Sequence, residues 1–499
     1  MRIVVCVKQT AAGELNPFDA CAYEAALQIP NSEVILLSMG PEKTEEMLLN
    51  LTRLGAKEGY LLCDRAFAGA DTLATAYTLS LAVKKLSPDL VICGRQTVDG
   101  DTAQTGPSLS VAAGLSLITN VMKIKDTIGY LVCETRDMGV QTAAYPALIT
   151  VERMNHLRLP SIRSKRGTVI KWTAEDIGVD LNRCGLKGSP TRVLASFQNE
   201  EGKRKCKLID TNQLADAIRE GLEKENRWLK PTQKSKELLK KVWIVGEAPR
   251  SFAESISEDI TVIHKDEFMN NRAIGQAFGS TGIESTRAFA EQFATYVQEK
   301  QPEVILWGSD AWSKAVAPQV AAILRTGLCA DCTALETDGE MLFMYRPAFS
   351  GNIVAKIACM TKPQMATVRT MEYGGAEVVC ALGKGAKNVV CDIQTLIQQK
   401  NEKAAKEKAP RWDIAASRLA VDAEMLPYEK QVGITGKSVN PAVYLAIGIS
   451  GAVHHIAGMK QSGTVIAVNP DRKAPIFDYA DYGIVETAEE VTAYLNKEM

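Results

Sequence analysis

The segment from Gln431 to Tyr482 has residue types and spacing suited to binding a phosphate-bearing ligand. An apolar run from Ala442 to Ile447 ends at Gly448, and Ser450 and Gly451 follow before apolar residues recur at helical spacing. A strand, a tight turn and the start of a helix leave backbone N–H groups without partners and place a partial positive charge at the helix start. The pattern therefore predicts a phosphate site at this turn.

A second apolar run in the same segment ends at a polar side chain. It extends from Thr464 to Val468 and is followed by Asn469. Open parallel sheets bind ligands at the carboxyl ends of their strands, so Asn469 stands where a ligand is expected. His454 and His455, two of the four histidines, lie in the first turns of the predicted helix. The segment thus combines a phosphate-binding backbone with side chains that can form hydrogen bonds to a ligand.

A glycine-bearing loop in the first half of the chain has similar potential. It follows the apolar run from Leu90 to Cys93 and leads into a predicted helix. Its backbone amides and threonine hydroxyls can surround phosphates. The candidate binding residues are Asp99, Asp101, Thr102, Gln104, Thr105 and Gly106. From these residues alone, an ordinary surface turn is an equal alternative.

The elements that position these residues alternate in type. Strand-like runs at Ile3 to Val7, Val34 to Ser38, Leu61 to Cys63 and Leu90 to Cys93 are separated by helical patterns. Such alternation predicts a parallel sheet with crossover helices. The pattern starts again after Lys241, with runs at Val242 to Val245, Thr261 to Ile263 and Val304 to Trp307.

Two local sequences repeat between these halves. They are PDLVICG from Pro88 to Gly94 and PEVILWG from Pro302 to Gly308. Each is followed by a helix that is expected to begin with proline. A glycine comes after that helix, Gly114 in the first half and Gly327 in the second. The repetition indicates an internal duplication of one nucleotide-binding-type unit.

The overall composition excludes several classes of function. The 499 residues include 58 basic and 59 acidic side chains, so no net field directs the chain to nucleic acid or to an anionic membrane. The chain opens with a strand and has no apolar run of membrane-spanning length, which favours a cytoplasmic protein without membrane insertion. Among 12 scattered cysteines, Cys329 and Cys332 have metal-ligand spacing but lack a second ligand pair, so a structural role is expected and no metal site.

The C-terminal segment resembles the FAD-binding domain of the alpha subunit of electron transfer flavoproteins. The matching motifs, in order, are QVGITGK at 431–437, GISGA at 448–452 with histidine following, and AVNPDRKAPIF at 467–477. RPAFSGNIVAKI at 346–357 and KPQMATVR at 362–369 resemble the first domain of the same subunit. An ordered match over about fifty residues is far more specific than a single glycine motif.

The N-terminal half resembles the beta subunit of the same family. The motifs are VKQ at 7–9, NPFD at 16–19, FAGADT at 67–72, CGRQTVDGDTAQTGP at 93–107, WTAEDIGVD at 172–180 and GLKGSPTRV at 185–193. The resemblance implies a beta–alpha fusion in one polypeptide. It also implies an α/β fold with two homologous parallel-sheet domains and a C-terminal doubly wound FAD-binding domain.

The expected domains follow from these matches. Residues 1–198 form a beta-like domain with a nucleotide site, 199–240 a polar linker or docking arm, 241–370 the alpha N-terminal domain, and 371–499 the FAD-binding domain.

The resemblance assigns roles to the C-terminal candidates. It places Arg418 over the flavin ring near N5 and Thr435 also near N5. It makes His455 a hydrogen-bond donor to the C2 oxygen of the ring. Gln431, Ser417, Ser450 and Asn469 would hold the ribityl, pyrophosphate and adenosine parts. Val432, Gly436 and Lys384 complete the cofactor-binding set, and no catalytic residue or metal ligand is expected.

Several positions depart from the family pattern. Lys384 replaces an arginine in a G-R-G motif, so a point charge stands in for a planar fork of donors. Ile434 and His454 each replace a glutamine, and Thr487 replaces an acidic residue. Only Thr10 to Leu15 separate VKQ from NPFD, which shortens one edge of the beta nucleotide site. These changes are expected to alter flavin tuning without abolishing binding.

Three functions remain open from the sequence. The first is a fused, electron-bifurcating flavoprotein with a second FAD at Asp99 to Gly106, because DGDTAQ resembles the bifurcating type. Its partners would be NADH, an acyl-CoA dehydrogenase-type flavoenzyme, and ferredoxin or flavodoxin. The second is a simple carrier with one FAD and a structural AMP, which accepts electrons from an acyl-CoA dehydrogenase. The third is an adenine-nucleotide-binding sensor without a redox role.

Overall fold

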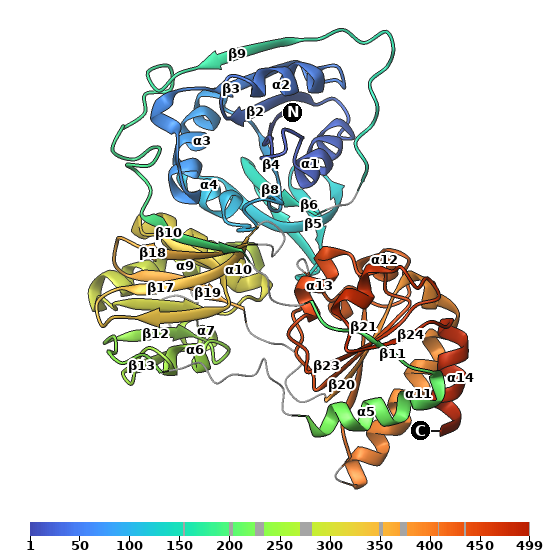
Figure 1. The fold of residues 1–499 in the computed structure, drawn as a ribbon. Helices are drawn as coiled ribbons and strands as arrows, with labels where there is room; N and C mark the ends of the chain where they lie inside the picture. The colour runs from blue at the N-terminus through green and yellow to red at the C-terminus, as the bar shows by residue number, and fades with distance from the viewer. Residues whose placement is uncertain are drawn as a thin grey trace. The chain divides into compact units, whose positions relative to one another are not determined.

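The protein folds into two compact α/β units (Figure 1). Their mostly parallel sheets confirm the fold class that the sequence predicts. The computed structural model describes residues 1–152, 155–198, 203–224, 234–269, 282–348, 353–369, 377–407, 409–433 and 436–498. The first unit comprises Met1–Phe197, Lys234–Phe349 and Val354–Arg369, and the second comprises Gln198–Gln233, Ser350–Ile353 and Thr370–Met499. In the described part of the chain, no helix has the length and apolar character needed to cross a membrane.

The first unit contains a sheet with the strand order β7-β6-β5-β8-β4-β1-β2-β3-β9. Its central strands are β1 (Arg2–Cys6), β4 (Leu90–Gly94) and β8 (Ala147–Val151). The others are β2 (Glu33–Met39), β3 (Glu58–Leu62), β5 (Ser116–Asp126), β6 (Leu131–Thr135), β7 (Val140–Ala143) and β9 (Thr168–Trp172). The central strands are continuous apolar runs because helices α1 (Pro17–Leu27), α2 (Thr44–Thr52), α3 (Thr72–Leu86) and α4 (Thr105–Ala113) cover the sheet.

A second parallel sheet in this unit has the order β13-β12-β14-β19-β15. Its strands are β12 (Val242–Val245), β13 (Ile260–Ile263), β14 (Val304–Trp307), β15 (Leu328–Cys332) and β19 (Gln364–Val368). Helices α9 (Gly282–Lys300) and α10 (Ala311–Leu324) pack on it. A small sheet of β10 (Thr191–Gln198), β18 (Ile353–Cys359), β17 (Leu342–Ala348) and β16 (Ala334–Thr337) completes the unit.

The two parallel sheets repeat one arrangement, which supports the predicted duplication. Strands β12, β14, β19 and β15 follow the same spatial order as β1, β4, β8 and β5. The equivalent strands β5 and β15 each contain a residue with positive φ, Asn120 at 55° in β5 and Asp331 at 54° in β15. Its backbone N–H donates to a threonine of the neighbouring strand, Thr150 at 3.1 Å and Thr367 at 2.8 Å.

The helices that follow β4 and β14 differ from the expectation that both begin with proline. Pro107 lies in the first turn of α4, whereas Pro318 lies in the middle of α10. The difference arises because Asp101 and Ala103 have φ values of 50° and 54°, which keep the first copy out of helix until Thr105. The first copy therefore has an open loop where the second has helix.

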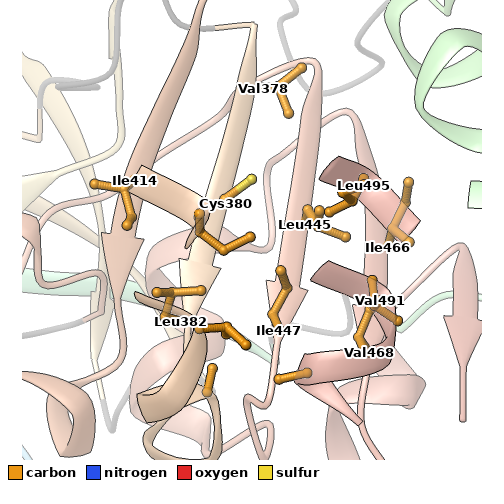
Figure 2. Close-up of a cluster of buried hydrophobic side chains, with 14 of the residues drawn as sticks. Val378, Cys380, Leu382, Ile414, Leu445, Ile447, Ile466, Val468, Val491 and Leu495 are labelled. Carbon is orange, nitrogen blue, oxygen red and sulfur yellow. The ribbon is translucent and has the colours of Figure 1, made fainter. Parts of the chain in front are cut away.

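The second unit contains a sheet with the order β11-β24-β23-β22-β20-β21. Its strands are β20 (Val378–Leu382), β21 (Trp412–Ala416), β22 (Val443–Ile447), β23 (Thr464–Val468) and β24 (Tyr482–Ile484), with the short strand β11 (Lys207–Leu208) at one edge. Alternate residues of β20, β22 and β23 point to one face, where Val491 and Leu495 of α14 (Ala488–Glu498) pack against them (Figure 2). Helix α11 (Val390–Lys406) contributes Ile393 and Leu396 to the same core.

The described part of the polar region after residue 198 packs on this second unit as an arm. Strand β11 runs parallel to β24, and α5 (Leu214–Glu223) buries Leu214 and Ile218 in the core of the sheet. Arg204, 1% exposed in its side chain, donates to the carbonyls of Lys460, Ser462 and Gly463 and pairs with Asp481. Residues 203–224 thus have packing contacts with the second unit, while the division into a linker or docking arm and the domain boundaries at 198, 240 and 370 stay a prediction.

Candidate cofactor sites

Four neighbouring strands of the second unit end at one edge, and the predicted polar residues follow them. Strands β20, β21, β22 and β23 are parallel and end at Leu382, Ala416, Ile447 and Val468. The polar side chains beyond these ends are Lys384, Ser417, Arg418, Gln431, Ser450, His455 and Asn469. Helices α12 (Arg418–Asp422) and α13 (Val453–Met459) start from this edge (Figure 1). The topology therefore brings the C-terminal candidates together, where an open α/β sheet binds its ligand.

Two glycines allow the loops of this edge to approach closely. A Cβ on Gly383 would collide with the Gly448 carbonyl, and one on Gly451, whose φ is 92°, would collide with the backbone of Pro475 and Ile476. By contrast, the nearest atom to a Cβ on Gly385 would be 3.9 Å away. The loops therefore interlock at Gly383 and Gly451, whereas Gly385 has room for a side chain.

Asn469 connects two of these loops. Its Nδ2 donates to the Ile449 carbonyl at 3.0 Å, and its Oδ1 accepts from the Asp471 backbone N–H at 2.9 Å. Ser450 is exposed, and its carbonyl accepts from the Ile476 N–H at 3.1 Å. Asn469 therefore positions the turn that carries Ser450, and Ser450 presents its hydroxyl outward.

His455 is buried beside Tyr444 of β22. Its Nε2 lies 2.9 Å from the Tyr444 hydroxyl. Burial lowers the pKa of His455 to about 4, against a smaller opposing effect of the Val432 backbone, so the imidazole is neutral at pH 7. When the Tyr444 hydroxyl donates to Nε2, Nδ1 carries the ring proton as a buried N–H donor. His454, the next residue toward the N-terminus, is exposed.

Ser417 and Arg418 begin helix α12. The Ser417 hydroxyl accepts from the Ala420 N–H at 3.3 Å as the N-cap. The Arg418 Nε lies 3.3 Å from the Asp422 carboxylate, one turn along the helix, and the Arg418 side chain is 26% exposed. Both residues thus have local structural contacts, and both stand at the carboxyl end of β21 where a ligand can reach them.

The remaining C-terminal candidates differ in exposure. Gln431 and Val432 are buried, and the Val432 N–H donates to the Ala416 carbonyl at 2.9 Å. Gly436 lies so close to the Gln431 carbonyl that a Cβ there would collide with it. Lys384 is exposed as the first residue of the 3₁₀ helix η4 (Lys384–Val389). Thr435 lies outside the described residues.

The predicted loop in the first unit has two parts. At its start, Asp99 pairs with the Lys8 ammonium at 2.9 Å. Partial burial would raise the pKa of Asp99, but hydrogen bonds from Lys8 and Thr97 outweigh it and hold the pKa below its usual value. Thr102 is half-buried, and Asp101 accepts from the Gln96 amide at 3.1 Å.

At its end, the loop is tied into the fold. Gln104 is buried, accepts from the Thr72 hydroxyl at 2.8 Å and donates to the Leu328 carbonyl at 3.2 Å. A Cβ on Gly106 would collide with the Thr150 methyl group, so this glycine allows α4 to approach β8. Thr105 is the first residue of α4 and half-buried. Gln104 and Gly106 therefore have structural contacts that the sequence does not predict, whereas 99–103 form the open part of the loop.

Two residues near this loop were missed as site candidates. Arg346 is 5% exposed, and its Nη2 donates to the Gly100 carbonyl at 2.8 Å. Asp19 is also 5% exposed and accepts from the Lys8 N–H at 2.8 Å. Both occur in motifs that carry the resemblance, RPAF and NPFD, but their burial against a loop distant in sequence leaves no local signal.

The residues at the edge of the second unit fit FAD. They offer a buried neutral imidazole, an arginine and a lysine for the ring, and an exposed hydroxyl and open glycine turn for the phosphates. No group of acidic, histidine and cysteine side chains in the described ranges has the geometry of a metal site. The edge is therefore suited to an organic cofactor with a pyrophosphate.

Comparison with known proteins agrees with this geometry. A model of the Electron transfer flavoprotein domain matches residues 3–177 and 282–390, more than half of the chain. A model of the Electron transfer flavoprotein FAD-binding domain matches residues 373–460. The first model matches two stretches, in agreement with the repeated sheet arrangement.

Relatives include both subunits of this family. The chain is 37% identical over 251 residues to the Electron transfer flavoprotein subunit alpha of Thermoanaerobacterium thermosaccharolyticum, covering 43% of this chain and 76% of the relative. It is 37% identical over 233 residues to subunit beta of the same organism, covering 44% and 88%. It is 39% identical over 229 residues to the Caffeyl-CoA reductase-Etf complex subunit CarD of Acetobacterium woodii, covering 40% and 87%. The chain therefore belongs to the electron transfer flavoprotein family and joins sequences related to its beta and alpha subunits in one polypeptide.

Proposed function

We propose that this flavoprotein holds one FAD in residues 371–499 and a second FAD at the loop from Asp99 to Gly106. In this proposal the chain takes hydride from NADH and passes electrons singly to two acceptors. One is an acyl-CoA dehydrogenase-type flavoenzyme, and the other is a low-potential carrier such as ferredoxin or flavodoxin. FAD supplies the ability to accept two electrons together and release them one at a time.

The residues of the C-terminal edge divide the binding of the first FAD. Ser450 and the glycine turn would hold the pyrophosphate, with Asn469 fixing the turn, while Ser417 and Gln431 contact the ribityl chain and adenosine. His455 would donate to the C2 oxygen from Nδ1, and Arg418, Lys384 and Thr435 would surround the ring. Val432 and Gly436 shape the wall through their backbone. These roles rest on the shared strand edge and on the resemblance.

The observation that favours FAD over AMP at the second site is a largely buried group of cations beside the loop. Arg346 reaches the loop through Gly100, while Lys314 and Arg369 both pair with Asp331, at 3.1 and 3.4 Å. Three cations against one carboxylate leave a surplus of positive charge beyond the backbone amides that suit the phosphates. A reduced flavin ring is anionic, so this surplus supports a second flavin.

Two further observations support the partner and the compartment. The name of the relative CarD places it in a complex with a reductase of a CoA ester, which supports a partner that acts on acyl-CoA. All 12 cysteines of the chain are free, which supports a reducing compartment such as the cytoplasm.

NADH titration under anaerobic conditions tests the proposed reaction. The purified protein is mixed with NADH, and the flavin absorbance near 450 nm is followed. We expect bleaching by NADH alone, to the level reached with dithionite. Flavin that dithionite reduces and NADH does not would contradict the proposed hydride transfer.

A simple carrier with one FAD and a structural AMP is the second candidate. It is favoured by the short segment between VKQ and NPFD, which closes into a tight hairpin. In this hairpin the Thr10 N–H donates to the Glu14 carbonyl at 2.8 Å, and Gly13 has a φ of 86°. A hairpin this short leaves less wall for a second flavin ring and suits the smaller nucleotide.

Replacing Arg418 by alanine should lower the midpoint potential of the C-terminal flavin without unfolding the protein. The partly exposed pair with Asp422, one turn along the same helix, contributes little stability, whereas a cation near the ring stabilises the anionic reduced form. A loss of about 1.4 kcal/mol corresponds to about 30 mV for a two-electron couple. Spectroelectrochemical titration measures this shift.

Arg411→Ala is the control, because Arg411 is exposed at the opposite end of β21. An unchanged potential in Arg418→Ala would remove Arg418 from the ring site.

A further inference from the structure

Asp19 lies beneath the backbone that leads into the loop from Asp99 to Gly106. It occupies the first turn of α1, and its Oδ2 accepts from the Lys8 N–H at 2.8 Å. A Cβ on Gly94 would collide with the Asp19 carboxylate, and the Gly94 backbone forms a hydrogen bond with it. The carboxylate therefore joins the chain after β1 to the chain after β4.

Asn16 extends this support along the same backbone. Its Nδ2 donates to the Gln96 carbonyl at 2.9 Å, and its Oδ1 accepts from the Val98 N–H at 3.3 Å. The Asn16 side chain also forms a hydrogen bond with Asp19. The start of α1 thus holds residues 94–98, directly before the phosphate loop.

The charged side chains around Asp19 are already paired with one another. The Lys8 ammonium faces Asp19 from the chain after β1 but pairs with Asp99. From β4, Cys93 lies near the carboxylate, and a hydrogen bond with Cys6 of β1, burial and the Asp19 charge raise the pKa of the Cys93 thiol. Arg95 beyond β4 pairs with the buried Glu152. Strand β8, which also packs against α1, has no titratable side chain. Burial raises the pKa of Asp19 to about 7, although the Asn16, Lys8 and Gly94 hydrogen bonds and the Lys8 charge oppose it.

We propose that Asp19 is a positioning residue of the second nucleotide site and takes up a proton when a nucleotide phosphate binds to the loop. The inference rests on the proposed site at Asp99 to Gly106. A phosphate brought to this loop adds negative charge near Asp19 and Asp99, and the neighbouring Lys8 ammonium is already paired with Asp99. Ionised Asp19 therefore disfavours the bound state, and by linkage nucleotide binding favours its protonated form.

The sign of the pH dependence follows from this linkage. Below pH 7 Asp19 is already protonated in the free protein, so affinity is at its maximum. Above pH 7 a proton must be taken up on binding, so affinity falls as the pH rises. A tenfold loss of affinity corresponds to one pH unit of difference between the free and bound pKa of Asp19.

Calorimetric titration with AMP tests the proposal, because AMP is the adenosine phosphate part of FAD. The full-length protein is first stripped of its bound flavin and nucleotide, so that the loop is vacant, and is then titrated between pH 6 and 8.5. We expect the affinity of the parent to fall about tenfold over this range and that of the isosteric variant Asp19→Asn to change much less. The amide keeps an acceptor for the Lys8 N–H but does not titrate.

The proton count provides a test that does not depend on the variant. At pH 7.5, titrations in two buffers of different ionisation enthalpy measure the protons taken up by the parent. AMP is already a dianion at this pH, so its own phosphate takes up no proton on binding. Uptake of about half a proton or more supports the proposal.

AMP binding without uptake, and with the same pH profile in parent and variant, overturns the role of Asp19 and leaves the site standing. Failure of both proteins to bind AMP overturns the nucleotide site, and the inference with it.

Discussion

A double variant with Ser450→Trp and Asn469→Leu is expected to lose its C-terminal flavin on desalting. The introduced indole would fill the exposed position of Ser450, whose hydroxyl is proposed to bind the pyrophosphate. The introduced leucine side chain would remove the Asn469 bond at 3.0 Å that holds the turn to the neighbouring loop, and the local bond from the Asp471 N–H at 2.9 Å that shapes the Asn469 loop. Each lost backbone hydrogen bond costs about 1 kcal/mol, and the steric block adds to this. Affinity for FAD should therefore fall by at least about 100-fold.

Absorbance after desalting and quantified FAD in the protein fraction measure the loss. Asn401→Leu is a matched control, because Asn401 makes the same pair of bonds with the backbone of Trp412, at 2.8 and 2.9 Å. Trp412 begins β21, so these bonds lie at the opposite end of the sheet from the proposed cofactor. The control should lose similar stability and keep its flavin. Full retention of FAD by the double variant would remove this edge from consideration as the FAD site.

Arg204→Ala is expected to loosen the arm and destabilise the second unit. The guanidinium is almost completely buried, with three carbonyls and the Asp481 carboxylate as partners. Removing one partner of a buried ion pair costs about 3–5 kcal/mol, because the other charge and the carbonyls lose their partner. Hydrogen exchange of the β23 and β24 amides, followed by mass spectrometry, should show protection reduced by about 100- to 1,000-fold.

The exposed pair between Arg219 and Asp216 on the same arm provides the control. Both side chains are more than two-thirds exposed, so Arg219→Ala should exchange like the parent. Equal protection in Arg204→Ala and Arg219→Ala would show that the arm contributes no more than a tether. Reduced protection confined to Arg204→Ala would show that the arm is part of the folded unit.

The strands that carry the candidate site could be predicted because they are buried on both faces. Such strands appear as continuous apolar runs, and the run from Thr464 to Val468 coincides with β23. The run predicted at Leu61 to Cys63 is instead β3 at Glu58–Leu62, because Glu58 and Gly59 interrupt its apolar pattern. Strand β11 has only two residues, one of them a lysine, so its pairing with β24 leaves no periodic signal.

The common place of the candidate residues at one sheet edge could be predicted, but their individual contacts could not. The parallel topology alone gathers Ser417, Ser450 and Asn469 at one edge. The amide of Gln104, by contrast, links the Thr72 hydroxyl to the Leu328 carbonyl. A glutamine at this position in the sequence does not show whether its amide faces a ligand or makes such a link. The burial of Asp19 likewise depends on Gly94, which is 75 residues away in the chain. Contacts between distant segments are set by packing, which local sequence does not encode.

The nucleotide content of the purified protein tests the central claim most directly. Protein is denatured, and the released FAD and AMP are separated, quantified and divided by the amount of chain. The account predicts about two FAD per chain and no AMP, since residues 371–499 and the loop from Asp99 to Gly106 each hold a flavin. One FAD with one AMP per chain would contradict the second flavin, and a colourless protein without FAD would contradict the account as a whole.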